Sequence, residues 1–304
     1  MALAFARGFA DAIGGSPIIV TGAGGWLGQA ALEMFAGILP PGQIQAFGST
    51  ARMQTLHNGT AIPVRPLTAL PEYAQGGAII FHFAFLTREH AGKMPLATYI
   101  EANRAISGTV EAVIRRHGAR GVFVPSSGAA ATADWAHNPY GALKQEDEQR
   151  FAGLGIPAVN MRVFNLAGPF INKLNSYALA CIIQDLLAAR PVTLRAAHPV
   201  WRGYAHVADV LNIALGLILA GESPPVFDSW GEPVELSALA NRAARLLGQP
   251  PGIQRPAWEH GAAEHYLGDA AAYHAHAARL RLELSSLDQQ IFDTAAYLGK
   301  CLAI

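Results

Sequence analysis

A tyrosine and a lysine stand four residues apart in the segment NPYGALKQEDE, residues 138–148. Since a proline precedes Tyr140 and four residues make about one helical turn, both side chains would project from one face of a helix. A phenol with an ordinary pKa of about 10 needs help to act near neutral pH, and a nearby ammonium stabilises its phenolate. Lys144 would supply that charge. The same spacing also arises by chance on surface helices, so the remaining sequence must decide.

A glycine-rich turn, TGAGGWLG at residues 21–28, follows the apolar run SPIIVTG. Gly22 permits a tight turn, Gly25 lets backbone N–H groups approach a pyrophosphate, and Gly28 lets the next helix pack closely on a sheet. The pyrophosphate would lie at the helix N-terminus, where free N–H groups and the dipole favour negative charge. Because the turn joins a buried strand to an amphipathic helix, it predicts dinucleotide binding; the alternative is an ordinary glycine-rich turn.

The second expected strand ends in FGSTAR, residues 47–52, and contains no carboxylate. An Asp or Glu there would bind the free 2′-hydroxyl of an adenosine ribose. Ser49, Thr50 and Arg52 suit a 2′-phosphate instead, through charge-assisted hydrogen bonds. The segment therefore favours NADP, with NAD as the alternative and a solvent-facing Arg52 as the simpler interpretation.

Apolar segments that alternate with helical ones must position these residues. We expect strands at residues 16–22, 43–49, 61–67, 77–85, 121–127 and 156–165, with helices after the first strand, over 96–117 and around the Tyr140 segment. Strands that are apolar throughout predict a parallel sheet covered on both faces, which binds ligands at the carboxyl ends of its strands. The predicted fold class is α/β, a doubly wound parallel sheet of Rossmann type. Residues 1–165 would form this domain, and residues 166–304 mainly a smaller C-terminal substrate-binding lobe, with a strand near 224–230 returning to the sheet.

The composition excludes several classes of protein. The 304 residues are 51% hydrophobic and 14% charged, with 22 basic and 22 acidic residues, so no global charge attracts nucleic acid. Cys181 and Cys301 are far apart and form no metal-binding pattern, which suits reduced thiols in a cytosol. The N-terminal segment lacks the features of a signal peptide, and no apolar run approaches the ~18 residues of a membrane span. We expect a cytoplasmic protein that binds no membrane.

Taken together, these segments are similar to the extended short-chain dehydrogenases of the NAD-dependent epimerase/dehydratase family, which act on nucleotide sugars. TGAGGWLG resembles the family's TGxxGxxG loop, VPSSGA its strand-five serine segment and YGALK its catalytic Y-x-x-x-K. YIEANRAISGTVEAV resembles its central helix, RVFNLAGP its R-x-x-N-x-x-G-P and RGYAHVADV its R-x-x-x-H-V-x-D. The ordered matches run from Thr21 to Asp209, about two-thirds of the chain.

The resemblance implies roles for individual residues. The Tyr140 hydroxyl would act as acid or base at a sugar hydroxyl or ketone, while Lys144 would also hydrogen-bond the nicotinamide ribose. The resemblance places Ser127, rather than Ser126, where it hydrogen-bonds the reacting oxygen, and Asn103 in a supporting position. The hydride belongs to the cofactor, which the protein orients against the sugar carbon. The implied catalytic residues are Ser127, Tyr140, Lys144 and Asn103; the implied cofactor-binding residues are Gly22, Gly25, Trp26, Leu27, Gly28, Ser49, Thr50, Arg52, Ala84, Tyr140 and Lys144.

The implied substrate is a nucleoside diphosphate sugar. Asn165 would contact its diphosphate, and Arg202 and Tyr204 would lie beside the nucleotide. One or two cations near a diphosphate are expected chemically. The segment that wraps the substrate in the family would contribute Asn172, Lys173 and Tyr177, although Lys173 equally suits a solvated loop.

Departures from the family pattern disfavour two of the reactions known in the family. The 4,6-dehydratases carry an Asp-Glu pair after the catalytic serine or threonine, whereas this chain has Gly128 and Ala129. Epimerase/reductases that invert C3 and C5 need a Cys and a His near the substrate, which PFINKLN does not supply. Two reactions at C4 remain: a 4-ketoreductase that uses NADPH once and releases it, favoured by Arg52, and a 4-epimerase that retains NAD.

Three further expectations complete the hypothesis. A catalytically silent relative that senses a cofactor is disfavoured, because Ser127, Tyr140 and Lys144 are all present. The histidines of YHAHAA diverge when spaced two apart on a helix, so we expect no metal site. Relatives pair through the two helices at residues 99–116 and 139–154, and the resemblance therefore implies a homodimer.

Overall fold

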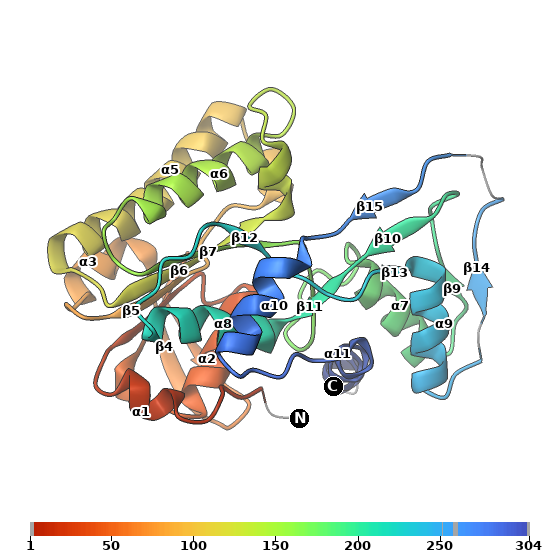
Figure 1. Ribbon diagram of the computed structural model, residues 1–304, viewed down its shortest axis with the longest axis horizontal. Helices are drawn as coiled ribbons and strands as arrows, with labels where there is room; N and C mark the ends of the chain where they lie inside the picture. Colours follow the sequence, from red (N-terminus) through yellow and green to blue (C-terminus); the bar gives the residue numbers. More distant parts are fainter. Residues whose placement is uncertain (1–2, 251, 258–260, 303–304) are drawn as a thin grey trace.

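The computed structural model describes residues 3–250, 252–257 and 261–302. Its main element is an eight-stranded sheet in the order β12-β7-β6-β5-β1-β2-β4-β3 (Figure 1). Neighbouring strands are parallel except for the edge strand β3, which runs antiparallel to β4. The strands are β1 (Ile18–Thr21), β2 (Ile44–Gly48), β3 (Arg52–Thr55), β4 (Ala61–Pro66), β5 (Ile79–His82), β6 (Gly121–Ser127), β7 (Ala158–Val163) and β12 (Phe227–Asp228). The predicted α/β fold with a doubly wound sheet is confirmed.

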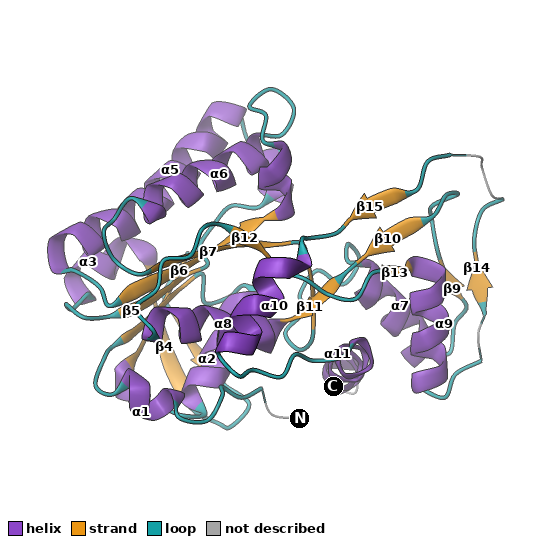
Figure 2. Ribbon diagram, viewed as in Figure 1, coloured by secondary structure: helices purple, strands orange, loops and turns teal. Residues whose placement is uncertain are grey.

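Helices cover both faces of this sheet (Figures 1 and 2). One layer contains α3 (Leu70–Tyr73), α5 (Leu96–His117) and α6 (Pro139–Ala152); the other contains α1 (Phe9–Ile13), α2 (Trp26–Ala36), α8 (Val207–Leu219) and α10 (Ala270–Arg279). Two buried apolar clusters lie on opposite sides of the strands, and adjacent residues of β1 alternate between them. Ile19 joins the cluster that contains Val110 of α5, whereas Val20 joins the one that contains Leu32 of α2. This two-sided burial explains why the strands are apolar throughout.

The remaining elements form the second lobe and its connections. Short sheets pair β8 (Asn165–Ala167) with β11 (Tyr204–His206), β9 (Val192–Thr193) with β14 (Ile253–Gln254), and β10 (Val200–Arg202) with both β13 (Val234–Glu235) and β15 (Glu264–Tyr266). The helices α7 (Ala178–Leu187), α9 (Leu236–Leu246) and α11 (Leu287–Leu302) pack beside them. Helix α4 (Arg88–Ala91) and the 3₁₀ turns η1 (Pro41–Gln43), η2 (Leu67–Ala69) and η3 (Gly128–Thr132) complete the described elements.

The local sequence explains how the two central helices begin and end. The Asn138 side chain accepts a hydrogen bond from Gly141 N at 3.0 Å, and Pro139 takes the first position of α6, where its missing N–H costs nothing. The helix predicted over 96–117 is confirmed as α5, which ends at Gly118 with a φ of 69°. Within the described residues, no helix is long and apolar enough to span a membrane.

Three expected strands differ in their ends. The strand expected at 77–85 stops at His82, because Ala84 N turns to donate to the Thr21 side chain at 3.2 Å instead of to a neighbouring strand. The strand expected at 156–165 divides into β7 and β8. A strand returns near 224–230 as β12, which pairs with β7. The antiparallel β3, which starts at Arg52, was not predicted because its sequence RMQT lacks a long apolar run.

Candidate active site

The glycine turn lies at the point where the strand order reverses, between β1 and β5, so it faces the segment that follows β5. Gly22 has a φ of 68°, and a Cβ there would lie 2.5 Å from the carbonyl carbon of Phe83. A Cβ on Gly28 would lie 2.2 Å from the carbonyl oxygen of Gly22. Both positions therefore require glycine. The arrangement is a backbone cradle at the start of α2, and it fits a pyrophosphate.

Trp26 and Leu27 open α2, so their backbone N–H groups have no partner within the helix. The Trp26 side chain is committed elsewhere. Its indole donates to the carbonyl of Pro169 at 2.6 Å, and its ring lies edge-on to Tyr177 at 5.5 Å. The backbone N–H of Trp26 can therefore face the cradle, while its side chain ties α2 to Pro169 and Tyr177.

Arg52 lies against the glycine turn although it belongs to the edge strand β3. A Cβ on Gly24 would lie 2.9 Å from Arg52 Nη2, and one on Gly48 would lie 3.2 Å from Nη1. The guanidinium donates to Gln54 at 3.1 Å, and Ser49 and Thr50 are exposed beside it. The structure thus brings the guanidinium of FGSTAR to the glycine turn between β1 and α2.

The two serines that end β6 have different partners. Ser126 donates to Glu148 at 2.5 Å, and Glu148 also receives two hydrogen bonds from Arg162 at 2.8 Å. Ser127 Oγ accepts a hydrogen bond from Ala129 N at 3.2 Å. Burial raises the pKa of Tyr140, while a hydrogen bond with Ser127 lowers it. Ser126 therefore belongs to a structural network, and Ser127 shares a site with the phenol.

Lys144 lies deep in the same site. Its ammonium donates to the carbonyl of Pro125 at 3.0 Å and lies 3.8 Å from the ring centre of Phe85. Burial lowers the pKa of Lys144 to about 8, although the nearby carboxylates Asp147 and Glu148 oppose that shift. The nearby charge that lowers the pKa of Tyr140 belongs to Arg88, whose guanidinium lies 5.2 Å from the phenol ring centre. The contribution expected from Lys144 stays a prediction; Lys144 and Tyr140 both contact the ring of Phe85.

Asn103 and Ala84 hold the segment between β5 and α4. Asn103 is buried; its side chain accepts from Leu86 N at 2.8 Å and donates to Leu86 O at 3.3 Å and Tyr99 O at 3.1 Å. Ala84 is fixed by its hydrogen bond to Thr21. Because these bonds of Asn103 go to backbone, its place in the site is that of a positioning residue.

The residues expected beside the substrate divide into two groups. Asn165 donates to Gly203 O at 3.1 Å and Tyr266 O at 3.4 Å, and Arg202 pairs with Glu264 at 2.5 Å. Tyr204 is only 3% exposed and packs in the core, so its side chain does not line an open surface. These three residues chiefly join segments of the second lobe.

The second group, Asn172, Lys173 and Tyr177, lies in the segment between β8 and α7. Burial raises the pKa of Tyr177 to about 12, and the nearby phenol of Tyr140 adds to this shift. Lys173 donates to Thr87 at 3.2 Å and pairs with Glu89 at 3.2 Å, whereas Asn172 is exposed.

Comparison with known proteins gives the family. The sequence profile of the NAD dependent epimerase/dehydratase family matches residues 18–228, more than half of the chain. The chain belongs to this family. A comparison with curated protein sequences finds no match.

Solved structures of nucleotide-sugar epimerases have a similar fold. The UDP-N-acetylglucosamine 4-epimerase of Methanobrevibacter ruminantium, in complex with UDP-N-acetylmuramic acid, aligns with a TM-score of 0.76 at 16% identity, covering 94% of this chain and 99% of that one. The UDP-glucose 4-epimerase of Thermotoga maritima with UDP-glucose gives 0.70 at 18% identity, covering 94% and 99%. The Thermus thermophilus UDP-glucose 4-epimerase with NAD gives 0.68 at 20% identity, covering 92% and 98%. At these identities the likeness shows the fold.

Three aromatic and charged residues of this epimerase/dehydratase family member were missed in the sequence analysis. Phe85 and Arg88 follow β5, and Tyr266 ends β15 and packs on Phe164 with ring centres 4.8 Å apart. Phe85 could have been found from its place just after the carboxyl end of a parallel strand. Tyr266 carries no such signal, because it belongs to the last third of the chain, where no motif matches.

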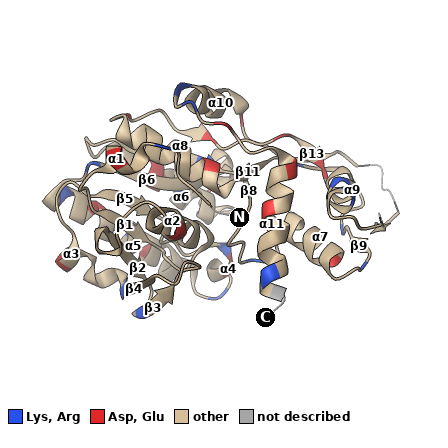
Figure 3. Ribbon diagram, turned by 90° about the horizontal axis from the view of Figure 1, so that it is seen from below, with Lys and Arg blue, Asp and Glu red and all other residues tan. Residues whose placement is uncertain are grey.

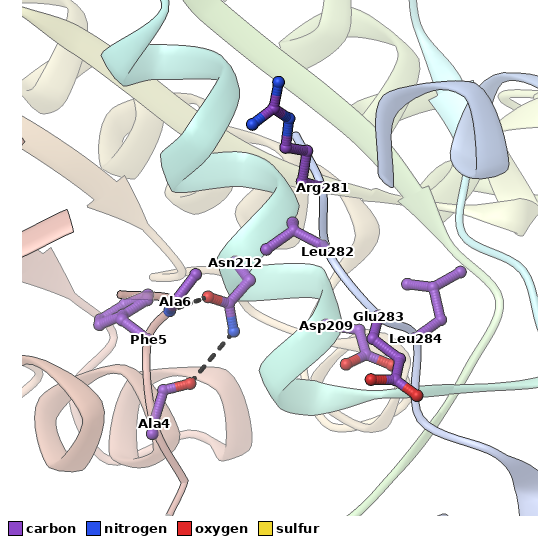
Figure 4. A pocket seen from close by; sticks show the side chains of 9 residues that line it. All are labelled: Ala4, Phe5, Ala6, Asp209, Asn212, Arg281, Leu282, Glu283 and Leu284. Atoms are coloured by element: carbon purple, nitrogen blue, oxygen red, sulfur yellow. Dashed lines mark hydrogen bonds between the residues drawn. The ribbon is translucent and has the colours of Figure 1, made fainter. Parts of the chain in front are cut away.

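Features outside this site include a cavity and a mixed distribution of charged residues. A cavity of about 240 Å³ lies between the N-terminal segment, α8 and residues 281–284, where Asn212 holds the backbone of Ala4 and Ala6 (Figure 4). Figure 3 shows basic and acidic residues interspersed along the ribbon rather than gathered by sign. Among the described residues, no group of three or more His, Cys, Asp or Glu side chains could hold a metal ion.

Proposed function

We propose that this chain catalyses hydride transfer at C4 of a nucleoside diphosphate sugar, with NADP(H) preferred to NAD(H) and reduction of a 4-keto sugar as the favoured reaction. The observation that carries the proposal is a chain of contacts at the carboxyl end of the sheet. Tyr140 and Lys144 both contact Phe85, which follows the residues Phe83 and Ala84 packed on Gly22, and Ser127 hydrogen-bonds Tyr140. The bound dinucleotide would supply the hydride.

The protein's own residues would handle the proton and orient the sugar. Tyr140 would hold its proton at the phenol oxygen until the developing alkoxide takes it, since burial raises its pKa. The Ser127 hydroxyl, which already meets that phenol, would hydrogen-bond the same reacting oxygen and fix its position. Lys144 would hold the nicotinamide ribose through its ammonium. Asn103 would keep the backbone before α4 in place.

The preference for NADP(H) rests on Arg52. Its guanidinium lies against Gly24 and Gly48, and the end of β2 carries no carboxylate to receive a free 2′-hydroxyl. A phosphate at that place would gain charge-assisted hydrogen bonds. Substrate contacts would come from Asn172, Lys173 and Tyr177, and from Asn165 and Arg202; the phenol of Tyr204 is buried and would lie beneath these contacts.

A second candidate is a nucleotide-sugar 4-epimerase that retains NAD. It is favoured by similar solved structures that are 4-epimerases, among them the Thermus thermophilus enzyme in complex with NAD. The two candidates differ in whether the cofactor is consumed.

In the first experiment, the protein is incubated with NADPH and a set of 4-keto nucleotide sugars. In the second, it is incubated with NAD and UDP-sugars. The sugars and the cofactor in each mixture are followed by NMR. The proposal predicts stoichiometric NADPH oxidation with a reduced sugar, abolished in Tyr140→Phe and retained in the exposed control Tyr73→Phe. Interconversion of C4 epimers with no net change in NAD would favour the second candidate. No turnover of any sugar by a protein that binds the cofactor would contradict both.

We also propose that two copies pair through α5 and α6. Leu96, the first residue of α5, and Trp135, in the segment that precedes α6, are 47% and 44% exposed, which supports an apolar contact there. Sedimentation velocity should show a dimer that the double substitution Leu96→Glu, Trp135→Glu dissociates. A monomer at all concentrations for the unchanged chain would contradict the pairing.

A further inference from the structure

Phe85 fills the space between the two residues on which the proposed chemistry depends. The ring centre lies 3.8 Å from Lys144 Nζ, and the same ring meets Tyr140 edge to face, with centres 5.7 Å apart and planes at 87°. The carbonyl of Pro125 takes a hydrogen bond from the ammonium. With these contacts, only 7% of Lys144 is exposed.

The backbone that carries Phe85 is fixed on both sides. Before it, Ala84 N donates to Thr21, and the carbonyl of Phe83 lies so close to Gly22 that a Cβ there would clash at 2.7 Å. After it, Leu86 is held through its N–H and its carbonyl by Asn103. Rotation of the Phe85 side chain is therefore the simplest movement that would uncover the ammonium.

The contact is also chemically favourable. The face of an aromatic ring carries partial negative charge and attracts a cation, most strongly where water is excluded. Phe85 itself is half-buried, so it has space on its outer side, while Lys144 is buried. The Phe85 ring is therefore attracted to the buried Lys144 ammonium, and it also has space on its other side into which it can turn.

We propose that Phe85 controls access to Lys144: the ring covers the ammonium and must turn away before a ribose hydroxyl of the dinucleotide can accept a hydrogen bond from it. The inference rests on the proposed function, because it takes Lys144 to be the residue that holds the ribose. Phe85 would then set both the rate and the affinity of dinucleotide binding.

The test measures the exposure of Lys144 directly. The unchanged protein, Phe85→Ala, Phe85→Leu and the control Phe83→Ala are treated with a water-soluble acylating reagent, and modification of Lys144 is timed by peptide mass spectrometry. Phe83 is a half-buried ring of the same segment, but it packs on Phe81 and Phe123 rather than on Lys144. Phe85→Leu keeps most of the apolar volume without the aromatic face, so it remains informative if Phe85→Ala folds poorly.

Both Phe85 variants should acylate Lys144 about 2- to 30-fold faster than the unchanged protein, the factor that corresponds to a cation–π contact of about 0.5–2 kcal/mol. Phe83→Ala should match the unchanged protein. Stopped-flow fluorescence should show NADPH binding with a larger association rate constant in the Phe85 variants. Equal acylation rates in all four proteins would overturn the inference.

The proposed function and the role of Phe85 can be refuted separately. Faster acylation in the Phe85 variants, combined with no NADPH binding by any of the four proteins, would show that the ring covers Lys144 but that the proposed function is wrong. Normal NADPH binding with unchanged acylation would overturn the role of Phe85 alone.

Discussion

Replacing Arg52 by alanine tests the cofactor preference at one residue. The guanidinium lies against the glycine turn at Gly24 and against Gly48, and its side-chain partner is the neutral amide of Gln54. Removing it therefore leaves no carboxylate unpaired at this place. We expect Arg52→Ala to weaken NADPH binding and to leave NADH binding nearly unchanged, because only NADPH carries the 2′-phosphate.

The expected loss of NADPH affinity in Arg52→Ala follows from the exposure of Arg52. A hydrogen bond to a charged group contributes about 1.5–3 kcal/mol, and Arg52 lies on an exposed edge strand where water and salt compete, so the lower part of that range applies. A loss of about 1.5–2 kcal/mol corresponds to NADPH binding about 10- to 30-fold weaker. The loss should shrink as ionic strength rises, because the interaction is between charges.

Isothermal titration calorimetry measures the binding of NADPH and of NADH to Arg52→Ala and to the unchanged protein, each at two salt concentrations. Arg65→Ala is a matched control, because Arg65 lies on the neighbouring strand β4 and stacks on Tyr73 at 4.1 Å rather than on the glycine turn. Equal losses for NADPH and NADH would mean that Arg52 acts on the shared part of the molecule. No loss for either would mean that Arg52 only faces solvent, and the argument for NADP would fail.

Three further predictions follow from single residues. Ser127→Ala should move the basic limb of the activity profile to higher pH, because the hydrogen bond that lowers the pKa of Tyr140 is lost; an unchanged profile would contradict the contact. Gly28→Ala should abolish dinucleotide binding and lower the melting temperature, because its Cβ would lie 2.2 Å from a carbonyl oxygen; tight binding by this variant would contradict the cradle. Burial lowers the pKa of His82 to about 3, so between pH 6.5 and 3 the unfolded chain binds a proton that the folded chain does not, and stability falls as pH falls. Denaturant titrations should give about 2 kcal/mol less stability at pH 5 than at pH 6.5 from this residue, a loss absent in His82→Leu.

The central sheet could be predicted because its determinants are local in sequence. Strands buried on both faces are apolar at most positions, and the turn after β1 shows its glycines directly. The edge strand β3 could not be predicted in the same way, since RMQT is stabilised by pairing with β4 and not by its own pattern.

The site could be predicted where a motif fixes the position and not where a distant partner does. Ser127 and Tyr140 lie together as the motifs suggest. Arg202, by contrast, pairs with Glu264, 62 residues further along, and the phenol of Tyr204 enters the core. Such partners come from the last third of the chain, where the sequence carries no recognisable spacing. The cover that Phe85 forms over Lys144 likewise depends on the packing of β5 against α6.

The measurement that tests the central claim most directly is the binding of dinucleotides to the purified protein. Any dinucleotide that the protein retains is released by denaturation and identified, and the protein stripped of it is titrated with NADPH and NADH. The glycine cradle and Arg52 predict saturable binding of both, with NADPH the tighter. Tightly retained NAD(H) would instead favour the 4-epimerase. Binding of neither dinucleotide would contradict the assignment of this site to hydride transfer.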